Sequence, residues 1–433
     1  MPTRLARDVR QSITCVGSTR TISFSPWASV RPEPPDPILG LVTAYKADPS
    51  DHKVNLAQGA YRTEEGAPLV FEAVRRAERA LVDDTLNKEY LEIEGYPEFR
   101  SLTAAFILGD DCSALVDSRV VTLQTLSGTG ALRVAAEWLE LMAPSKEVWM
   151  SSTSYGNHPR IFSRAGLRVK YFSYLDESGV GLDFDRMLAD LSSIVPPGAS
   201  VLLQACAHNP TGIDPTRAQW DAIAKVFAER GLLPVFDSAY QGFATGDPDS
   251  DAYAVRAFVG AGLRPMVCTS YAKSMGLYGE RVGALSLVCS SASEAAAVMS
   301  QLKQRIVRPM YSSPPLHGAR IAARVLGDPE LRNLWLDELR QVSARVQGVR
   351  QRLAEELTRV GAGGPARTWH HISHQVGMFA FTGLSSEHVD ALRGEHQVYL
   401  TRDGRLSLAG LSSRDIPYIT NAIKSVLAKC NKT

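Results

Sequence analysis

The sequence has few of the features that would place a protein in a membrane, on nucleic acid or in an oxidising compartment. None of its apolar runs approaches the roughly 18 residues that a membrane-spanning helix needs. Its six cysteines are scattered without a C-x-x-C pair, which argues against a zinc site or a disulfide framework and fits a reducing compartment. The 47 Lys and Arg against 46 Asp and Glu leave a net charge of +1, so no basic surplus is present to hold nucleic acid phosphates. With 433 residues, 45% of them hydrophobic, we expect a soluble globular protein of two or three domains.

The first 24 residues differ from the rest of the chain. They contain four arginines against one aspartate among many Ser and Thr, and apolar residues recur at helical spacing: Leu5, Val9, Ile13 and Val16. An Arg- and Ser-rich, acid-poor amphipathic start without an apolar h-region is typical of a mitochondrial transit peptide. We therefore expect a transit peptide at residues 1–24 and the mitochondrial matrix as location, with the cytoplasm or a plastid as alternatives. The competing interpretation is an N-terminal tail without function.

The rest of the chain divides into an arm and two patterns. Prolines punctuate residues 25–40, so residues 25–68 are expected to form an extended arm and the start of a small domain. Between residues 69 and 340 strands alternate with helices, which predicts a large α/β domain with a mostly parallel sheet flanked by helices. The strands are expected at residues 120–123, 147–150, 201–205, 233–236, 265–269 and 284–288, and the helices at 131–142, near 160 and at 217–229. A long helical pattern at 331–358 and short strands at 378–382 and 405–408 predict a smaller α+β domain at 341–433.

A strand is followed by Ser127-Gly128-Thr129-Gly130 and then by a helix. Backbone N–H groups and hydroxyls at a helix N-terminus form an anion site, and the alternative is a plain N-cap. Arg133 stands where a dinucleotide fingerprint has its third glycine, so a single phosphate is the better expectation.

Several charged residues lie among apolar or small neighbours. Lys273 follows an expected strand, where partial burial suits a Schiff-base nucleophile, although most lysines are solvated surface groups. Asp237 ends an apolar strand, either as a turn-former or as the partner of a cationic ring nitrogen. Arg281, Arg308 and Arg405 need either internal ion pairs or a dianionic ligand. The histidine cluster His370, His371 and His374 matches no zinc spacing, so we expect structural or exposed residues there and no metal site.

Three motifs together resemble the aspartate aminotransferase family, fold-type I enzymes that use pyridoxal 5′-phosphate. They are AHNPTG at residues 207–212, FDSAYQGF at 236–243 and KSMGLYGERVG at 273–283. Further matches run in order from residue 34 to residue 405, nearly the whole chain. The resemblance implies the fold-type I architecture of a large, mostly parallel domain and a smaller α+β domain, assembled as a homodimer with shared active sites.

The resemblance also implies roles for residues at matching positions. Lys273 would hold the cofactor and shuttle a proton between the substrate α-carbon and the cofactor's C4′ carbon. Asp237 would pair with the pyridine nitrogen, and Asn209 and Tyr240 would hydrogen-bond the phenolic oxygen. Tyr155 would stack on the ring. The phosphate would be held by Ser127, Gly128, Thr129, Ser270 and Arg281, with Tyr90 reaching it from the neighbouring subunit.

For the substrate, the resemblance implies two arginines for two carboxylates. Arg405, helped by Gly59 and Asn209, would bind the α-carboxylate, and Arg308 would cross the dimer interface to the side-chain carboxylate. The implied reaction is the reversible ping-pong transfer of the amino group of L-aspartate to 2-oxoglutarate. A relative that also accepts aromatic amino acids would keep both arginines and stays an alternative.

Four residues depart from the family pattern. Tyr155 replaces a Trp, Ala272 a Ser, Gln204 a His and Ser407 an Asn. These changes predict slower turnover or looser cofactor binding, and they motivate a rival interpretation as a weakly catalytic paralogue kept for binding. The intact pair of Lys273 and Asp237 weighs against that rival.

Overall fold

The computed structural model describes residues 25–365 and 367–430, so the transit peptide predicted at residues 1–24 lies outside the described part. Met1–Asp36 and Pro37–Thr433 are two separate compact units. In the first unit, residues 26–29 form a turn and residues 30–36 have no regular structure. Helix α1 (Leu39–Ala47) begins two residues after Pro37, the last proline of the run, so residues 39 and 40 of the proline-punctuated stretch are helical rather than extended. The predicted domain boundaries at residues 68 and 340 stay predictions.

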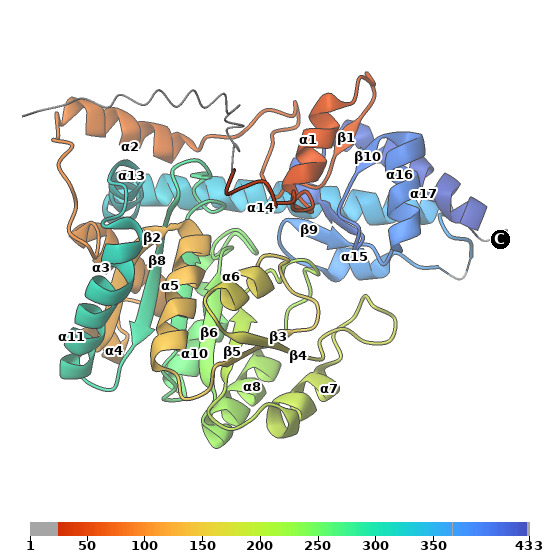
Figure 1. Ribbon diagram of the computed structural model, residues 1–433. Coiled ribbons are helices and arrows are strands. Elements are labelled where there is room, and N and C mark those ends of the chain that lie inside the picture. The colour runs from red at the N-terminus through yellow and green to blue at the C-terminus, as the bar shows by residue number, and fades with distance from the viewer. Residues whose placement is uncertain (1–24, 366, 431–433) are drawn as a thin grey trace, which may run out of the picture. The chain divides into compact units, whose positions relative to one another are not determined.

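A seven-stranded sheet is the centre of the second unit (Figure 1). Its spatial order is β2 (Val120–Leu126), β8 (Val282–Val288), β7 (Met266–Ser270), β6 (Leu233–Ser238), β5 (Ser200–Gln204), β3 (Glu147–Ser151) and β4 (Arg168–Phe172). Neighbouring strands are parallel except that β8 is antiparallel to both β2 and β7. The predicted mostly parallel α/β sheet is therefore confirmed, with one reversed strand that the sequence pattern did not reveal.

Both faces of the sheet are buried, which explains why its strands are continuous apolar runs. On one face Leu203, Phe236 and Val267 pack in one hydrophobic cluster with Trp220 and Phe258. On the other face Leu202, Val235, Cys268 and Leu285 form a second cluster, which also includes the helix residues Ala131 and Ile161. Because successive side chains of a strand point to opposite faces, residues 202 and 203 belong to different clusters.

Helices lie before and between the strands of this sheet in the sequence. From residue 72 to β8, the last strand of the sheet in chain order, they are α2 (Glu72–Asp83), α3 (Pro97–Leu108), α4 (Ser113–Val116), α5 (Ser127–Met142), α6 (His158–Arg164), α7 (Phe184–Ala189), α8 (Arg217–Arg230), α9 (Pro248–Asp251) and α10 (Tyr253–Gly260). Two π-helical turns, η1 (Asp190–Ile194) and η2 (Leu302–Val307), extend α7 and α11 (Ala292–Gln301), respectively. Helix α8 has the capping box that Thr216 and Gln219 encode, and it ends at Gly231 in the left-handed conformation.

The C-terminal part is built on the 31-residue helix α14 (Pro329–Arg359), which runs across the upper part of the view in Figure 1. Asp328 caps it by accepting hydrogen bonds from the N–H groups of Glu330 and Leu331. Two small sheets lie in this part: β1 (Val54–Asn55) with β10 (Val398–Tyr399), parallel, and β9 (Phe379–Phe381) with β11 (Arg405–Ser407), antiparallel. The remaining elements are α11 (Ala292–Gln301), α12 (Arg308–Tyr311), α13 (His317–Gly327), α15 (His370–His374), α16 (Ser386–His396), α17 (Ile416–Cys430), η3 (Leu408–Gly410) and η4 (Ser413–Asp415).

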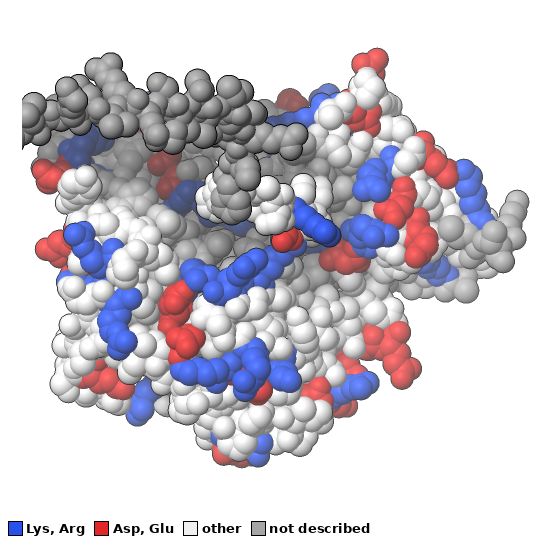
Figure 2. All heavy atoms as spheres, viewed as in Figure 1, with Lys and Arg blue, Asp and Glu red and all other residues white. Residues whose placement is uncertain are grey.

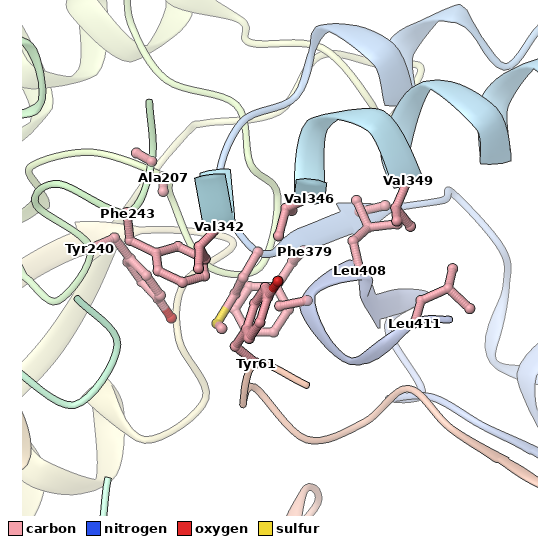
Figure 3. Close-up of a cluster of buried hydrophobic side chains, with 14 of the residues drawn as sticks. Tyr61, Ala207, Tyr240, Phe243, Val342, Val346, Val349, Phe379, Leu408 and Leu411 are labelled. Atoms are coloured by element: carbon pink, nitrogen blue, oxygen red, sulfur yellow. The ribbon is translucent and has the colours of Figure 1, made fainter. Parts of the chain in front are cut away.

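A third hydrophobic cluster joins the long helix to the loops at the sheet edge. Figure 3 shows Val342 of α14 beside Phe243, Val346 near Phe379 and Val349 near Leu408, and all of them belong to one cluster with Tyr240. Tyr61 and Phe243 contact edge to face, with ring centroids 6.5 Å apart. The loop after β6 and the strand β9 are thus anchored on one apolar core.

Charges of both signs are interspersed on the face in Figure 2. No helix within residues 25–365 and 367–430 is long and apolar enough to cross a membrane.

Candidate active site

A cleft of about 220 Å³ lies at the edge of the central sheet where the parallel strands end and β8 begins. Ligand sites of open α/β sheets lie at this edge, because the loops after neighbouring parallel strands meet there. Twelve of the fourteen predicted site residues line the cleft: Gly59, Ser127, Gly128, Thr129, Tyr155, Asn209, Asp237, Tyr240, Ser270, Lys273, Arg281 and Arg405. They lie at or after the carboxyl ends of β2, β3, β5, β6 and β7, precede β8, or come from the N-terminal and C-terminal parts of the chain.

Tyr90 and Arg308 lie outside this lining. Tyr90 is 88% exposed, and Arg308 is an exposed residue that donates a hydrogen bond to Ser312. Both residues were predicted to act on the cleft of a neighbouring subunit, so their absence from the lining of their own chain's cleft does not contradict the prediction. Their roles stay predictions.

The loop after β2 forms a cradle of hydroxyl and N–H groups. Ser127 is in the left-handed conformation with φ 60°, and its hydroxyl lies 2.8 Å from that of Ser270. No side chain caps helix α5, so the alternative of a plain N-cap is wrong, and the first N–H groups of the helix are left for another acceptor. A Cβ added at Gly128 would lie 3.2 Å from Cβ of Ser270, so a side chain at this position would crowd the cradle.

Lys273 lies in the loop after β7 and is partly exposed as a residue. Its amine lies 5.7 Å from the centre of the Tyr240 ring. Burial lowers the pKa of this amine to about 8, with Arg281 and Arg405 acting in the same direction and Asp237 opposing them. At pH 7 about a tenth of the amine is therefore a neutral nucleophile and base, far more than for a lysine of ordinary pKa.

Asp237 is a residue of β6 rather than of a turn, so the turn-former alternative is wrong. Its Oδ2 lies 2.9 Å from Nε2 of the fully buried His158, and Nδ1 of that ring lies 2.8 Å from the hydroxyl of Ser154. The chain of three polar groups fixes the carboxylate at the edge of the cleft.

Asn209 and Tyr240 face each other in the cleft. Nδ2 of Asn209 lies 3.5 Å from the Tyr240 hydroxyl. Burial, followed by the charge of Asp237, raises the pKa of that phenol. Tyr240 is therefore a hydrogen-bonding group, with its proton kept at neutral pH.

Arg405 is 3% exposed, yet it forms no ion pair with any carboxylate of the described residues. Its Nη1 donates to Oδ1 of Asn209 at 3.0 Å and its Nη2 to the carbonyl of Ala57 at 2.8 Å. Burial lowers its pKa, and its Nε has no protein partner. A buried guanidinium held only by neutral acceptors is suited to bind a carboxylate in the cleft.

Sequence reasoning missed the apolar part of the site. Phe379 lies under Arg405, with the guanidinium carbon 4.2 Å from the ring centre, and Ile38 and Leu39 also line the cleft. Apolar side chains carry no chemical signature, so only the tertiary structure distinguishes them from core residues. Among the described residues, no group of three or more His, Cys, Asp or Glu is placed to hold a metal ion.

Comparison with known proteins agrees with this geometry. The family profile "Aminotransferase class I and II" matches residues 51–423. The chain belongs to this family. It is 50% identical over 402 residues to the cytoplasmic isozyme 2 of aspartate aminotransferase from Arabidopsis thaliana, covering 93% of this chain and 98% of the relative. It is 46% identical over 427 residues to the mitochondrial aspartate aminotransferase of Xenopus tropicalis, covering 98% and 99%.

The aminotransferase fold is also shared with solved structures. An aromatic-amino-acid aminotransferase from Burkholderia pseudomallei, covalently bound to pyridoxal phosphate, aligns with a TM-score of 0.89 at 43% identity, over 93% of this chain and all of that one. Pyridoxal phosphate is the expected cofactor of the family. The cleft fits it chemically, because it combines a cradle for an anion, a lysine of lowered pKa and a fixed carboxylate.

Proposed function

We propose that the chain is a pyridoxal phosphate-dependent aspartate transaminase, which transfers the amino group of L-aspartate to 2-oxoglutarate and gives oxaloacetate and L-glutamate. The observation that carries this is one cleft that combines the buried amine of Lys273, the fixed carboxylate of Asp237 and the buried Arg405 without an acidic partner. A transaminase that uses pyridoxal phosphate needs these three functions together: a nucleophile and base, a partner for the cationic ring and a carboxylate receptor.

The chain's residues would hold the cofactor at three points. Ser127, Gly128, Thr129, Ser270 and Arg281 would bind its phosphate, joined by Tyr90 from a neighbouring subunit. Asp237, fixed by His158, would pair with the ring nitrogen, while Asn209 and Tyr240 would donate to the phenolic oxygen and Tyr155 would cover the ring. When bound, the cofactor supplies the electron sink that stabilises the carbanion formed at the substrate α-carbon.

Lys273 would move the proton. A neutral amine is needed to remove the proton from the α-carbon, and burial near Arg281 and Arg405 favours the neutral form. The same nitrogen would also be the group that returns the proton to the cofactor's C4′ carbon, so one residue would act as base and as acid.

Two arginines would orient the substrate. Arg405 would bind the α-carboxylate beside Gly59 and Asn209, and its guanidinium is already fixed by Asn209 and Ala57. Arg308 would reach the second carboxylate from the other subunit of a homodimer, which accounts for its exposure in a single chain.

The half-reaction tests this proposal. The protein is loaded with pyridoxal phosphate, and L-aspartate is added without a keto acid while the visible absorbance of the bound cofactor is recorded. The absorbance should change and then be restored by 2-oxoglutarate, and Lys273→Ala should abolish both changes. A wild-type protein whose absorbance aspartate leaves untouched would refute the proposal and favour the weakly catalytic paralogue.

A broader donor range is the second candidate, favoured by the structural similarity to an aromatic-amino-acid aminotransferase. Phenylalanine and aspartate compared as donors, by kcat/KM, distinguish the two. A ratio near one would establish the broader range.

The mitochondrial location is also part of the proposal and rests on residues 1–24. Curated relatives come from the cytoplasm, from chloroplasts and from mitochondria, so similarity alone does not choose between these compartments. Residues 1–40 fused to a fluorescent reporter should direct it to mitochondria, and a diffuse cytosolic signal would contradict the location.

A further inference from the structure

Gln204 bridges the loop that follows strand β5. Its side chain is buried, its Nε2 donates to the carbonyl of Asn209 at 2.9 Å, and its Oε1 accepts from the N–H of Asn209 at 2.8 Å. The primary amide thus pairs with both backbone polar groups of one residue, as a neighbouring strand would. No other residue between 204 and 209 is bonded to Gln204, so the amide closes a loop of four residues onto its own strand end.

The residue that Gln204 fixes is the one that holds Arg405. The Asn209 side chain accepts a hydrogen bond from Nη1 of Arg405 at 3.0 Å. The other acceptor of this guanidinium, the carbonyl of Ala57, lies in a different part of the chain. The Asn209 side chain and the Ala57 carbonyl therefore hold the buried guanidinium together, one at each Nη atom.

We propose that Gln204 is a positioning residue for carboxylate binding, which acts on Arg405 through Asn209. This rests on the proposed function, because it deepens the description of the same site. Gln204 lies outside the residues that line the cleft, so its effect on a bound carboxylate would be indirect. Gln204 holds the backbone of Asn209 in a fixed position relative to the end of β5, so that the side-chain oxygen of Asn209 lies within hydrogen-bond distance of the Arg405 guanidinium.

A role of this kind differs from a purely structural one in what it changes. Loss of two buried hydrogen bonds lowers stability wherever they are in the protein. If Gln204 is a positioning residue, its loss also weakens the binding of a carboxylate, and it does so only while the Asn209 side chain is present to transmit the effect. The chain offers a matched control in Gln241, also buried, whose Nε2 donates to the carbonyls of Phe106 and Pro248.

The experiment measures the dissociation constant of succinate, a four-carbon dicarboxylate that carries no amine, by calorimetry on the cofactor-loaded protein. Gln204→Met keeps the length of the side chain and removes both bonds. It should raise the Kd about five- to tenfold and raise the KM for aspartate similarly, with kcat changed less than about twofold. Gln241→Met should lower the thermal midpoint by a similar amount and leave the Kd unchanged.

A double-mutant cycle then tests the route through Asn209. In the Asn209→Ala background, Gln204→Met should change the Kd by less than about twofold. A full additive effect, an unchanged Kd in Gln204→Met, or an equal rise in Gln241→Met would each overturn the proposal. If Gln204→Met does not fold, Gln204→Glu replaces it: this variant keeps the acceptor for the Asn209 N–H, loses the donor to its carbonyl, and should raise the Kd likewise.

The outcome is distinguishable from a failure of the proposed function. If the wild type transaminates aspartate and Gln204→Met binds succinate normally, only the role of Gln204 is refuted. If the wild type neither transaminates nor binds succinate, both proposals fail.

Discussion

The carboxylate of Asp237 and the imidazole of His158 lie in hydrogen-bond contact, with 2.9 Å between Oδ2 and Nε2, and His158 is fully buried. The imidazole is held in turn by Ser154 through Nδ1. A buried ring with partners on both nitrogens has one orientation, so the carboxylate it contacts is fixed as well.

We predict that His158→Phe lowers kcat/KM for aspartate about tenfold, because one buried oxygen of Asp237 loses its partner. His158→Gln can still donate to that oxygen and should retain more activity. Steady-state kinetics with aspartate and 2-oxoglutarate check this order, and equal activity of His158→Phe and wild type would show that the contact is dispensable.

The lowered pKa of Lys273 predicts a pH dependence of cofactor capture by the unloaded protein. The amine is mostly protonated and unreactive below its pKa of about 8 and mostly neutral above it, so the second-order rate should be half-maximal near pH 8 and level off above about 9. Stopped-flow absorbance with pyridoxal phosphate between pH 6.5 and 9.5 measures this rate. A rise that continues toward pH 10 would mean that the amine has the pKa of an ordinary lysine.

Mixing two inactive variants tests whether Arg308 serves the other subunit. Lys273→Ala and Arg308→Ala homodimers should both be impaired with aspartate. Subunits exchanged between them should recover about a quarter of wild-type activity, since half of the dimers are hybrids and each hybrid has one intact site. No recovery, with exchange verified by mass spectrometry, would place Arg308 in the site of its own subunit.

Tyr155→Trp should raise kcat/KM for aspartate. The tyrosine lines the cleft and contacts His158 edge to face, with ring centroids 5.2 Å apart. An indole offers a larger stacking surface and an N–H donor in the same place. Unchanged kinetics would refute the interpretation that this position limits turnover, and Tyr155→Phe is the control for the loss of the hydroxyl.

Gly283→Ala should lower the free energy of unfolding by about 2–3 kcal/mol. A Cβ at this position of β8 would lie 2.3 Å from the carbonyl oxygen of Thr269 and 2.8 Å from the backbone of Ser127, so the sheet and the anion cradle would both have to move. Gly279→Ala meets no atom within 4 Å and should change stability by less than about 0.5 kcal/mol. Urea denaturation compares the two, and an equal loss would contradict the steric argument.

The sequence by itself determined the strand segments, the family and the candidate chemistry. Runs such as 233–236 are apolar because both faces of the sheet are covered, and the predicted strands of this sheet are confirmed with ends shifted by up to three residues. The family resemblance is confirmed, while the roles of the individual site residues stay predictions. Strand β4 was missed, because Arg168–Phe172 is a mostly solvated edge strand with a polar pattern. Helix α5 begins four residues earlier than predicted. The prediction started the helix late because Gly128 and Gly130 have low helix propensity. In the structure, packing at the end of the sheet favours a helical first turn in spite of these glycines.

Only the tertiary structure decided which residues meet. The reversal of β8, its place between β2 and β7, and the contact of Arg405 with Asn209 across 196 residues of sequence are not encoded in any local pattern. Local propensity acts over a few residues. Strand order and the positions of buried charges depend instead on how apolar side chains from distant segments pack together on both faces of the sheet and against α14. For that reason the sequence predicted the charged groups of the cleft. Only the structure showed that Phe379 lies under Arg405 and that Gln204 hydrogen-bonds to Asn209, which in turn holds Arg405.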